Sequence, residues 1–250
     1  AIGYGSQKAE LYLQQQIPKA NIIRLDSDTA RKRDDLTNIL KDFREEKIDI
    51  LVGTQILAKG HDFPNVTLVV LLEVDKHLNL PDFRSGERTF QLMVQAAGRS
   101  GRSGHDGKVM VQTMNQQNKI IQNAAHHDYL SFMEEEISFR KKYAYPPFSK
   151  MVLLEFTSTN ENILEAYIEQ LNKWVESFFS QKENPFEDLK IQGPYSPGLE
   201  KLQMRWRKHL LIKSENIAML HKFVHVFTEG DRKRPEEIRL KIDVDPQSLL

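Results

Sequence analysis

The chain contains no cysteine, and its formal net charge is zero. Without cysteine it has neither a disulfide framework nor a cysteine-ligated zinc site. Without net charge, any affinity for nucleic acid must come from local basic patches. The sequence also shows no apolar run of membrane-spanning length and no recognisable secretory leader. We therefore expect a globular protein of the cytoplasm with no membrane association.

Sequence motifs that bind nucleotides or metals are missing as well. There is no Gly-x-x-x-x-Gly-Lys-Ser/Thr and no Asp-Glu-x-His sequence, and these motifs hold ATP phosphates and Mg²⁺. The Gly-x-Gly at residues 3–5 lacks both a preceding strand and a third glycine, so we expect it to form a turn before a helix. His221 and His225 lie four apart but have no acidic partner with matching spacing. We predict no metal site.

The 250 residues that are present suffice for two ordinary domains. Up to residue 113, short apolar strands alternate with helical patterns, which predicts a parallel α/β sheet. Near-continuous apolar runs at residues 48–52 and 66–74 are typical of buried parallel strands. After residue 146 the order is strand-helix-strand-strand-helix-strand, typical of a ferredoxin-like α+β domain. Because two prolines interrupt the chain at residues 146–147, we place the boundary between residues 1–145 and 146–250. We expect the second domain to fold on its own.

One Gly-rich stretch carries two arginines and follows a helix predicted over residues 82–95. It reads Gln95-Ala96-Ala97-Gly98-Arg99-Ser100-Gly101-Arg102. Glycine lets the backbone approach a ligand closely, and a guanidinium can grip two phosphate oxygens at once. Arg99 and Arg102 are therefore candidate phosphate ligands. A solvated basic loop is the plainer alternative, and the stretch by itself leaves both open.

Polar residues follow a strand predicted over residues 48–52. Ligands of parallel sheets gather at the carboxyl ends of the strands, where Thr54 and Gln55 fall. Hydroxyl and amide groups suit sugar-phosphate contacts, and the Asp62 carboxylate suits a ribose hydroxyl. An ordinary strand-to-helix turn with Asp62 as a cap is equally compatible with these residues.

A second basic patch lies on a strand predicted over residues 202–212. Alternation places Arg205 and Arg207 on one face and Trp206 on the other. We expect two helices to cover the Trp206 face and to leave the arginine face open for DNA phosphates. A solvated strand face without a ligand is the alternative.

Several segments resemble motifs V and VI of superfamily 2 helicases, namely residues 53–66 and 95–102. A more specific segment, together with the end of the chain, is similar to the primosomal protein N′ (PriA) family of replication-restart DNA helicases. Those sequences are Pro81-Asp82-Phe83-Arg84-x-x-Glu87-Arg88-x-x-Gln91 and Asp243-Val244-Asp245-Pro246. The resemblance covers essentially the whole chain and implies a RecA-like second helicase lobe followed by the ferredoxin-like domain.

The resemblance also implies roles for individual residues. Arg102 matches the arginine finger, and Arg99 matches its phosphate-contacting companion. Thr54 matches a contact to single-stranded DNA. Three further residues match positions in motifs V and VI near the nucleotide: Gly60, Asp62 and Gln95.

The same resemblance implies ligands and partners. ATP and Mg²⁺ would be held mainly by a helicase lobe absent from this chain, and the family's zinc-binding cysteines are absent too. The implied partners are branched and single-stranded DNA, single-stranded DNA-binding protein and primosome proteins. We expect the chain to be part of an ATP-dependent 3′-5′ DNA helicase and to be inactive alone. A motor-free scaffold for DNA or protein is the alternative.

Overall fold

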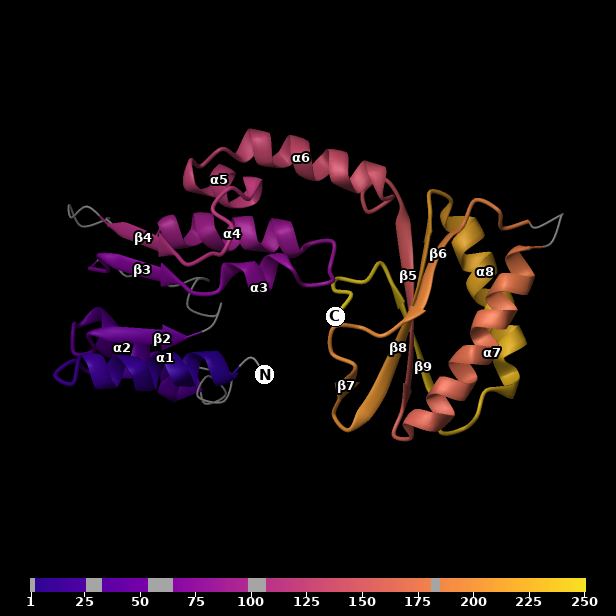
Figure 1. Ribbon diagram of the computed structural model, residues 1–250, viewed down its shortest axis with the longest axis horizontal. Helices are drawn as coiled ribbons and strands as arrows, with labels where there is room; N and C mark the ends of the chain where they lie inside the picture. Colours follow the sequence, from indigo (N-terminus) through magenta and orange to yellow (C-terminus); the bar gives the residue numbers. More distant parts are fainter. Residues whose placement is uncertain (1–2, 26–32, 54–64, 99–106, 181–184) are drawn as a thin grey trace. The chain divides into compact units, whose positions relative to one another are not determined.

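The computed structural model describes residues 3–25, 33–53, 65–98, 107–180 and 185–250 (Figure 1). The residues group into two compact units, the first formed by residues 1–75 and 88–128 and the second by residues 76–87 and 129–250. The second unit thus includes a segment from the middle of the chain. The domain boundary predicted at residue 146 stays a prediction.

The first unit is an α/β structure with parallel strand pairs. Strand β1 (Ile22–Leu25) pairs with β2 (Ile50–Gly53), and β3 (Leu68–Leu71) pairs with β4 (Lys108–Val111), both in parallel. The helices of this unit are α1 (Gly3–Gln16), α2 (Arg33–Arg44) and α5 (Lys119–Ala125). Two further helices, α3 (Val74–Leu78) and α4 (Ser85–Ala97), each lie partly in the first unit and partly in the second. Parallel strands with intervening helices confirm the predicted fold class.

Three local predictions for this unit are wrong. Residues 3–5 do not form a turn, because α1 already begins at Gly3. The strand expected over residues 66–74 ends at Leu71, because Glu73 has a left-handed φ of 53° and α3 begins at the next residue. Full burial was expected for the strand at residues 48–52, but β2 is only half-buried.

The second unit carries an antiparallel sheet in the order β6-β8-β5-β9. Its strands are β5 (Lys150–Ser158), β6 (Lys190–Tyr195), β8 (Arg205–Ser214) and β9 (Arg239–Val244). The other elements are α6 (Tyr129–Lys142), α7 (Glu161–Phe179), the short strand β7 (Lys201–Leu202), α8 (Ile217–Gly230) and the 3₁₀ turn η3 (Asp231–Lys233). This order and connectivity confirm the predicted ferredoxin-like domain.

The strand predicted over residues 202–212 is a hairpin in the structure. Strands β7 and β8 pair through Leu202 and Arg205 across a two-residue turn. Both turn residues, Gln203 and Met204, have positive φ, at 48° and 64°. Such a turn matches the twist of paired strands, which explains why the chain reverses there.

Helices α7 and α8 lie side by side over one face of this sheet (Figure 1). Asn160 and Asn216 cap them, each with a side-chain oxygen that accepts main-chain N–H bonds from the first turn. Beneath the helices lies an apolar core that includes Leu154, Phe156, Leu164, Leu171, Leu210, Ile212, Phe223 and Phe227. Trp206 packs against this core, as predicted.

The opposite face of the sheet is also covered. Met151, Leu153 and Leu211 point to that side and are buried against Phe83 and Leu249. Period-two alternation along β5 and β8 sends neighbouring residues to opposite faces, so both faces of this sheet are apolar at the centre. The open face predicted for this sheet is therefore wrong.

Candidate nucleotide and nucleic-acid site

Most residues predicted to contact nucleotide or DNA lie outside the described residues. They are Thr54, Gln55, Gly60, Asp62, Arg99 and Arg102. What the structure describes is the scaffold from which they extend. Strand β2 ends at Gly53, directly before Thr54, and α4 ends at Ala97, two residues before Arg99.

Gln95 is the predicted site residue that the structure places on this scaffold. It lies in the last turn of α4 and is exposed. The buried residues of the helix are Thr89, Phe90, Met93 and Ala96, which recur at helical spacing. Gln95 therefore points away from the core, and its nucleotide contact stays a prediction.

Hydrogen bonds tie together the carboxyl ends of β3 and β4. The Asp75 carboxylate accepts from the Thr113 hydroxyl at 2.9 Å and from the Met114 N–H at 2.8 Å. The Met114 hydrogen bond holds the pKa of Asp75 below its usual value. The Gln112 side-chain oxygen accepts from the Glu73 N–H at 3.2 Å. Asp75 is thus engaged in joining two segments of the fold.

Residues 76–87, which we call the docked segment, lead into α4 and belong to the second unit. Asp82 is buried, and its side chain accepts from the Arg84 N–H at 3.0 Å and from the Ser248 hydroxyl at 3.1 Å. Its main-chain oxygen accepts from the Ser85 N–H at 2.9 Å. This turn explains why α4 begins at Ser85, three residues later than the sequence predicted.

Phe83 is the apolar anchor of the docked segment. Its ring stacks on Tyr145 with 5.0 Å between centroids and 8° between planes. The guanidinium groups of Arg84 and Arg140 lie 5.2 Å and 5.3 Å from its centroid. Lys213 lies 4.2 Å from the Tyr145 ring on the same face of the sheet. Desolvation by burial raises the pKa of Tyr145 and lowers that of Lys213.

Arg140 links the docked segment to α6. One guanidinium nitrogen lies 2.7 Å from the Glu87 carboxylate, and another lies 2.7 Å from Glu136 within α6. The Arg140 side chain is 13% exposed and that of Glu87 is 33% exposed, so this ion pair is partly shielded from water. Arg84 donates to Gln247 near the end of the chain. Sequence reasoning used the docked segment only as a family signature and missed these contacts.

The two arginines predicted to bind DNA differ in their surroundings. Arg207 is 7% exposed and lies 2.5 Å from the Glu155 carboxylate, and it donates to the main-chain oxygens of Leu199 and Leu250. Arg205 is half-buried and donates to the Thr157 main chain at 2.9 Å. The DNA contact of both residues stays a prediction, but Arg207 does not lie on the open face that the prediction required.

A buried cluster surrounds Arg207. His209 is fully buried, and its Nε2 lies 3.1 Å from the same Glu155 oxygen. The His209 hydrogen bond, together with the Arg207 guanidinium, lowers the pKa of Glu155 to about 2. These groups sit on the sheet face opposite the helices, where they hold one another.

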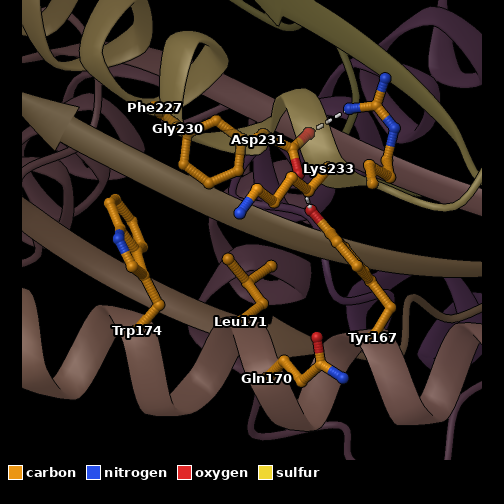
Figure 2. Close-up of a pocket in the computed structure, with 9 residues that line it drawn as sticks. Tyr167, Gln170, Leu171, Trp174, Phe227, Gly230, Asp231 and Lys233 are labelled. Carbon is orange, nitrogen blue, oxygen red and sulfur yellow. Dashed lines mark hydrogen bonds and ion pairs between the residues drawn. The ribbon is translucent and has the colours of Figure 1, made fainter.

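A small hollow lies between α7 and the η3 turn (Figure 2). Leu171, Trp174 and Phe227 form its apolar wall. The Tyr167 hydroxyl donates to Asp231 at 2.5 Å, and Arg234 also contacts Asp231. Desolvation raises the pKa of Tyr167. Because its acid is already paired, the hollow presents no unpaired carboxylate to a ligand.

Two further findings concern metal ions and membranes. Within the described ranges, no group of three His, Cys, Asp or Glu side chains is placed to hold a metal ion. Among the helices that the structure describes, none has the length and apolarity needed to cross a membrane.

Comparison with known proteins matches each part of the chain to a family. Residues 4–104 match the helicase conserved C-terminal domain, and residues 141–247 match the primosomal protein N C-terminal domain. The chain is 35% identical to the replication restart protein PriA of Bacillus subtilis and 36% identical to that of Borreliella burgdorferi. Each alignment covers 99% of the chain but only 30% and 36% of the relative, so the chain spans about a third of its relatives' length.

The solved structures that resemble the chain include the C-terminal domain of the DEAD-box protein Dbp5. That likeness covers 54% of the chain and 76% of the other, with a TM-score of 0.37 and 22% identity.

The fold and the family matches define a helicase lobe joined to a ferredoxin-like domain. More particularly, the chain belongs to the family of the replication restart protein PriA and matches the C-terminal domains of that family.

Proposed function

We propose that this chain supplies half of the ATP site and part of the single-strand track of an ATP-dependent 3′-5′ DNA helicase that restarts stalled replication forks. The observation that carries the proposal is the sequence Gln95-x-x-Gly98-Arg99-x-Gly101-Arg102 at the end of α4 in a chain of this family. The polarity and the fork-restart role rest on the family resemblance.

The proposed chemistry is charge stabilisation during phosphoryl transfer. Arg102 acts as the arginine finger on charge that develops at the γ-phosphate, with Arg99 beside it. Gly60, Asp62 and Gln95 line the nucleotide. The sequence has no phosphate-binding lysine motif, so ATP and Mg²⁺ are held mainly by residues outside this chain. When bound, they supply the phosphoryl group and its counter-charge.

The proposed partners are branched and single-stranded DNA, single-stranded DNA-binding protein and other primosome proteins. Support comes from relatives named as replication restart proteins and from a domain described as that of primosomal protein N. Thr54 and Gln55 contact the single strand in this proposal, and the cytoplasmic location stays a prediction.

The test is Arg102→Ala in a full-length protein that carries this chain. We expect kcat for DNA-stimulated ATP hydrolysis to fall by about 10³-fold or more with DNA affinity kept, because an arginine finger acts in the transition state. The matched control is Arg239→Ala, at an exposed arginine on β9. We expect it to leave both kcat and DNA affinity unchanged. We expect the 250-residue chain alone to hydrolyse no ATP.

Loss of DNA binding with normal turnover in Arg102→Ala contradicts the assigned role. A full-length protein that binds DNA but hydrolyses no ATP supports the motor-free scaffold instead.

A further inference from the structure

Helix α4 connects the docked segment to the arginine-bearing stretch. Its first three residues, Ser85 to Glu87, belong to the second unit, and the remaining residues to Ala97 belong to the first. Gly98 continues the hydrogen bonding, since its N–H donates to the Val94 oxygen at 3.0 Å. Arg99 and Arg102 follow one and four residues later in the sequence.

The start of α4 is held by three kinds of contact within the second unit. Asp82 fixes the turn through its bonds to the Arg84 N–H and the Ser248 hydroxyl. Phe83 is stacked on Tyr145 and is 6% exposed. Glu87, on the first turn of the helix, pairs with Arg140 of α6. Stacking, a hydrogen-bonded turn and a shielded ion pair together leave this end little freedom.

We propose that the docked segment positions the arginine-bearing stretch, so that Phe83, Glu87 and Arg140 are positioning residues for ATP hydrolysis. The proposal rests on the proposed function, in which Arg102 is the arginine finger. None of the three residues is expected to touch ATP. They act through α4, whose first turn they fix to the ferredoxin-like unit.

The physical reason is that an α-helix transmits orientation along its length. Thirteen residues at about 1.5 Å each make α4 roughly 20 Å long, so a change at its first turn is carried to its last. Transition-state stabilisation depends steeply on position, and a misplacement of about 1 Å can cost ~10²-fold in rate. Release of the docked segment therefore lowers kcat although the reacting groups remain.

The test is a double-mutant cycle on Glu87 and Arg140 in the full-length protein. Glu87→Gln and Arg140→Gln are each expected to lower DNA-stimulated kcat by about fivefold or more, at the lower end of measured couplings between sites. Arg140→Gln also removes the contact to Glu136, but both substitutions remove the same Glu87–Arg140 pair, so the double variant should have the kcat of Arg140→Gln alone. The KM for ATP stays unchanged, since ATP binding is untouched.

Glu136→Gln is the matched control. Glu136 contacts Arg140 at the same 2.7 Å and is more shielded than Glu87, at 11% against 33% exposed, but it lies within α6 and not in the docked segment. We expect Glu136→Gln to leave kcat unchanged while lowering the melting temperature at least as much as Glu87→Gln does. A general loss of stability would instead lower kcat in both variants.

Equal kcat in wild type, Glu87→Gln and Phe83→Leu, with Arg102→Ala inactive, overturns the positioning role and keeps the proposed function. Full turnover in Arg102→Ala overturns the proposed function itself. A fall in kcat with Glu136→Gln equal to that with Glu87→Gln also contradicts the positioning role, because the link to the docked segment would then be irrelevant.

Discussion

The two faces of the ferredoxin-like sheet are built from different parts of the chain. The helix face is covered by α7 and α8, which directly follow the strands they pack on, and its core is apolar throughout. The other face is covered by the docked segment, Tyr145 and Leu249, and beside its apolar cluster lies the Arg207–Glu155–His209 cluster. One face is completed locally, whereas the other depends on residues as distant in sequence as Phe83.

The helix face stabilises the domain, whereas the opposite face connects the domain to the docked segment. The residues of the helix-face core all lie between Val152 and Leu240, so we expect this face to form without the rest of the chain. The second face requires the docked segment, and the docked segment is also the start of α4. The second face therefore ties the sheet to the first turn of α4.

The largest expected effect comes from removing Phe83 and Tyr145, which cover the sheet face opposite the helices. We expect residues 147–250 alone to be about 2–4.5 kcal/mol less stable than the same sheet in the full chain, because buried Phe83 contributes about 1.5–3 kcal/mol and half-buried Tyr145 about half as much. A fragment of residues 129–250, which keeps Tyr145 but lacks Phe83, should have a stability between those of residues 147–250 and the full chain. Urea unfolding of the three proteins measures this order.

Tryptophan fluorescence separates the two faces in that experiment. The chain has two tryptophans, Trp174 and Trp206, and both pack against the helix-face core. Their native emission should persist in residues 147–250 at low temperature. Equal urea midpoints in all three proteins would show that the second face adds no stability, and the independent domain predicted from the sequence would stand unmodified.

The next effect concerns Glu155, whose pKa is lowered from 4.5 to about 2. A carboxylate with a lowered pKa stabilises the fold fully above about pH 4.5, and this stabilisation is lost as the pH falls toward 2. The shift corresponds to on the order of 3 kcal/mol for a side chain that is 17% exposed. Glu155→Gln should therefore be less stable than wild type at pH 7, with the difference shrinking between about pH 4.5 and 2.

Asp243→Asn is the control for this pH series. Asp243 pairs with Lys241 on the surface, where an ion pair typically contributes about 0–1 kcal/mol. Thermal unfolding of both variants from pH 2 to 7 gives the comparison. If Glu155→Gln follows wild type at every pH, the buried cluster does not carry the pH dependence.

The same contrast between faces shows what the sequence can predict. Period-two alternation placed Trp206 against the helices, and the spacing of apolar residues located α7 and α8, because these signals arise from neighbours in the chain. The covering of Arg207 arises from Leu199, Leu250 and a carboxylate on another strand. No local pattern encodes those contacts.

The candidate site divides in a similar way. Motif spacing singled out Arg99 and Arg102 and placed Gln95 on a helix. The structure confirms that Gln95 lies on a helix, and the roles of the three residues stay predictions. The anchoring role of Phe83 and Glu87 was not predicted, although both lie in a segment recognised for its family signature. A signal was available, because an aromatic residue just before a helix and an acid in its first turn suggest contacts with other elements. Their partners, Tyr145 and Arg140, lie more than fifty residues away in the sequence, so the sequence alone does not identify them.

The smallest expected effect tests whether the sheet face opposite the helices also binds DNA. Arg205 is half-buried and donates to the Thr157 hydroxyl and to two main-chain oxygens, whereas Arg207 is buried in an ion pair. If Arg205 contacts one phosphate, Arg205→Ala should flatten the log–log salt dependence of binding by at most about 0.9. Arg207→Ala should leave that slope unchanged while lowering the melting temperature, because it uncovers a buried carboxylate.

Titration of the full chain with a labelled forked duplex at several salt concentrations, below the melting temperature of each variant, measures both slopes. An unchanged slope in Arg205→Ala would remove this strand from the DNA track. A slope flattened by Arg207→Ala alone would mean that DNA opens the Glu155 pair and takes its place. The structure favours Arg205 over Arg207 as a DNA contact. If Arg207 bound a phosphate in place of Glu155, the shielded carboxylate would lose its partner, whereas Arg205 gives up only hydrogen bonds to neutral groups.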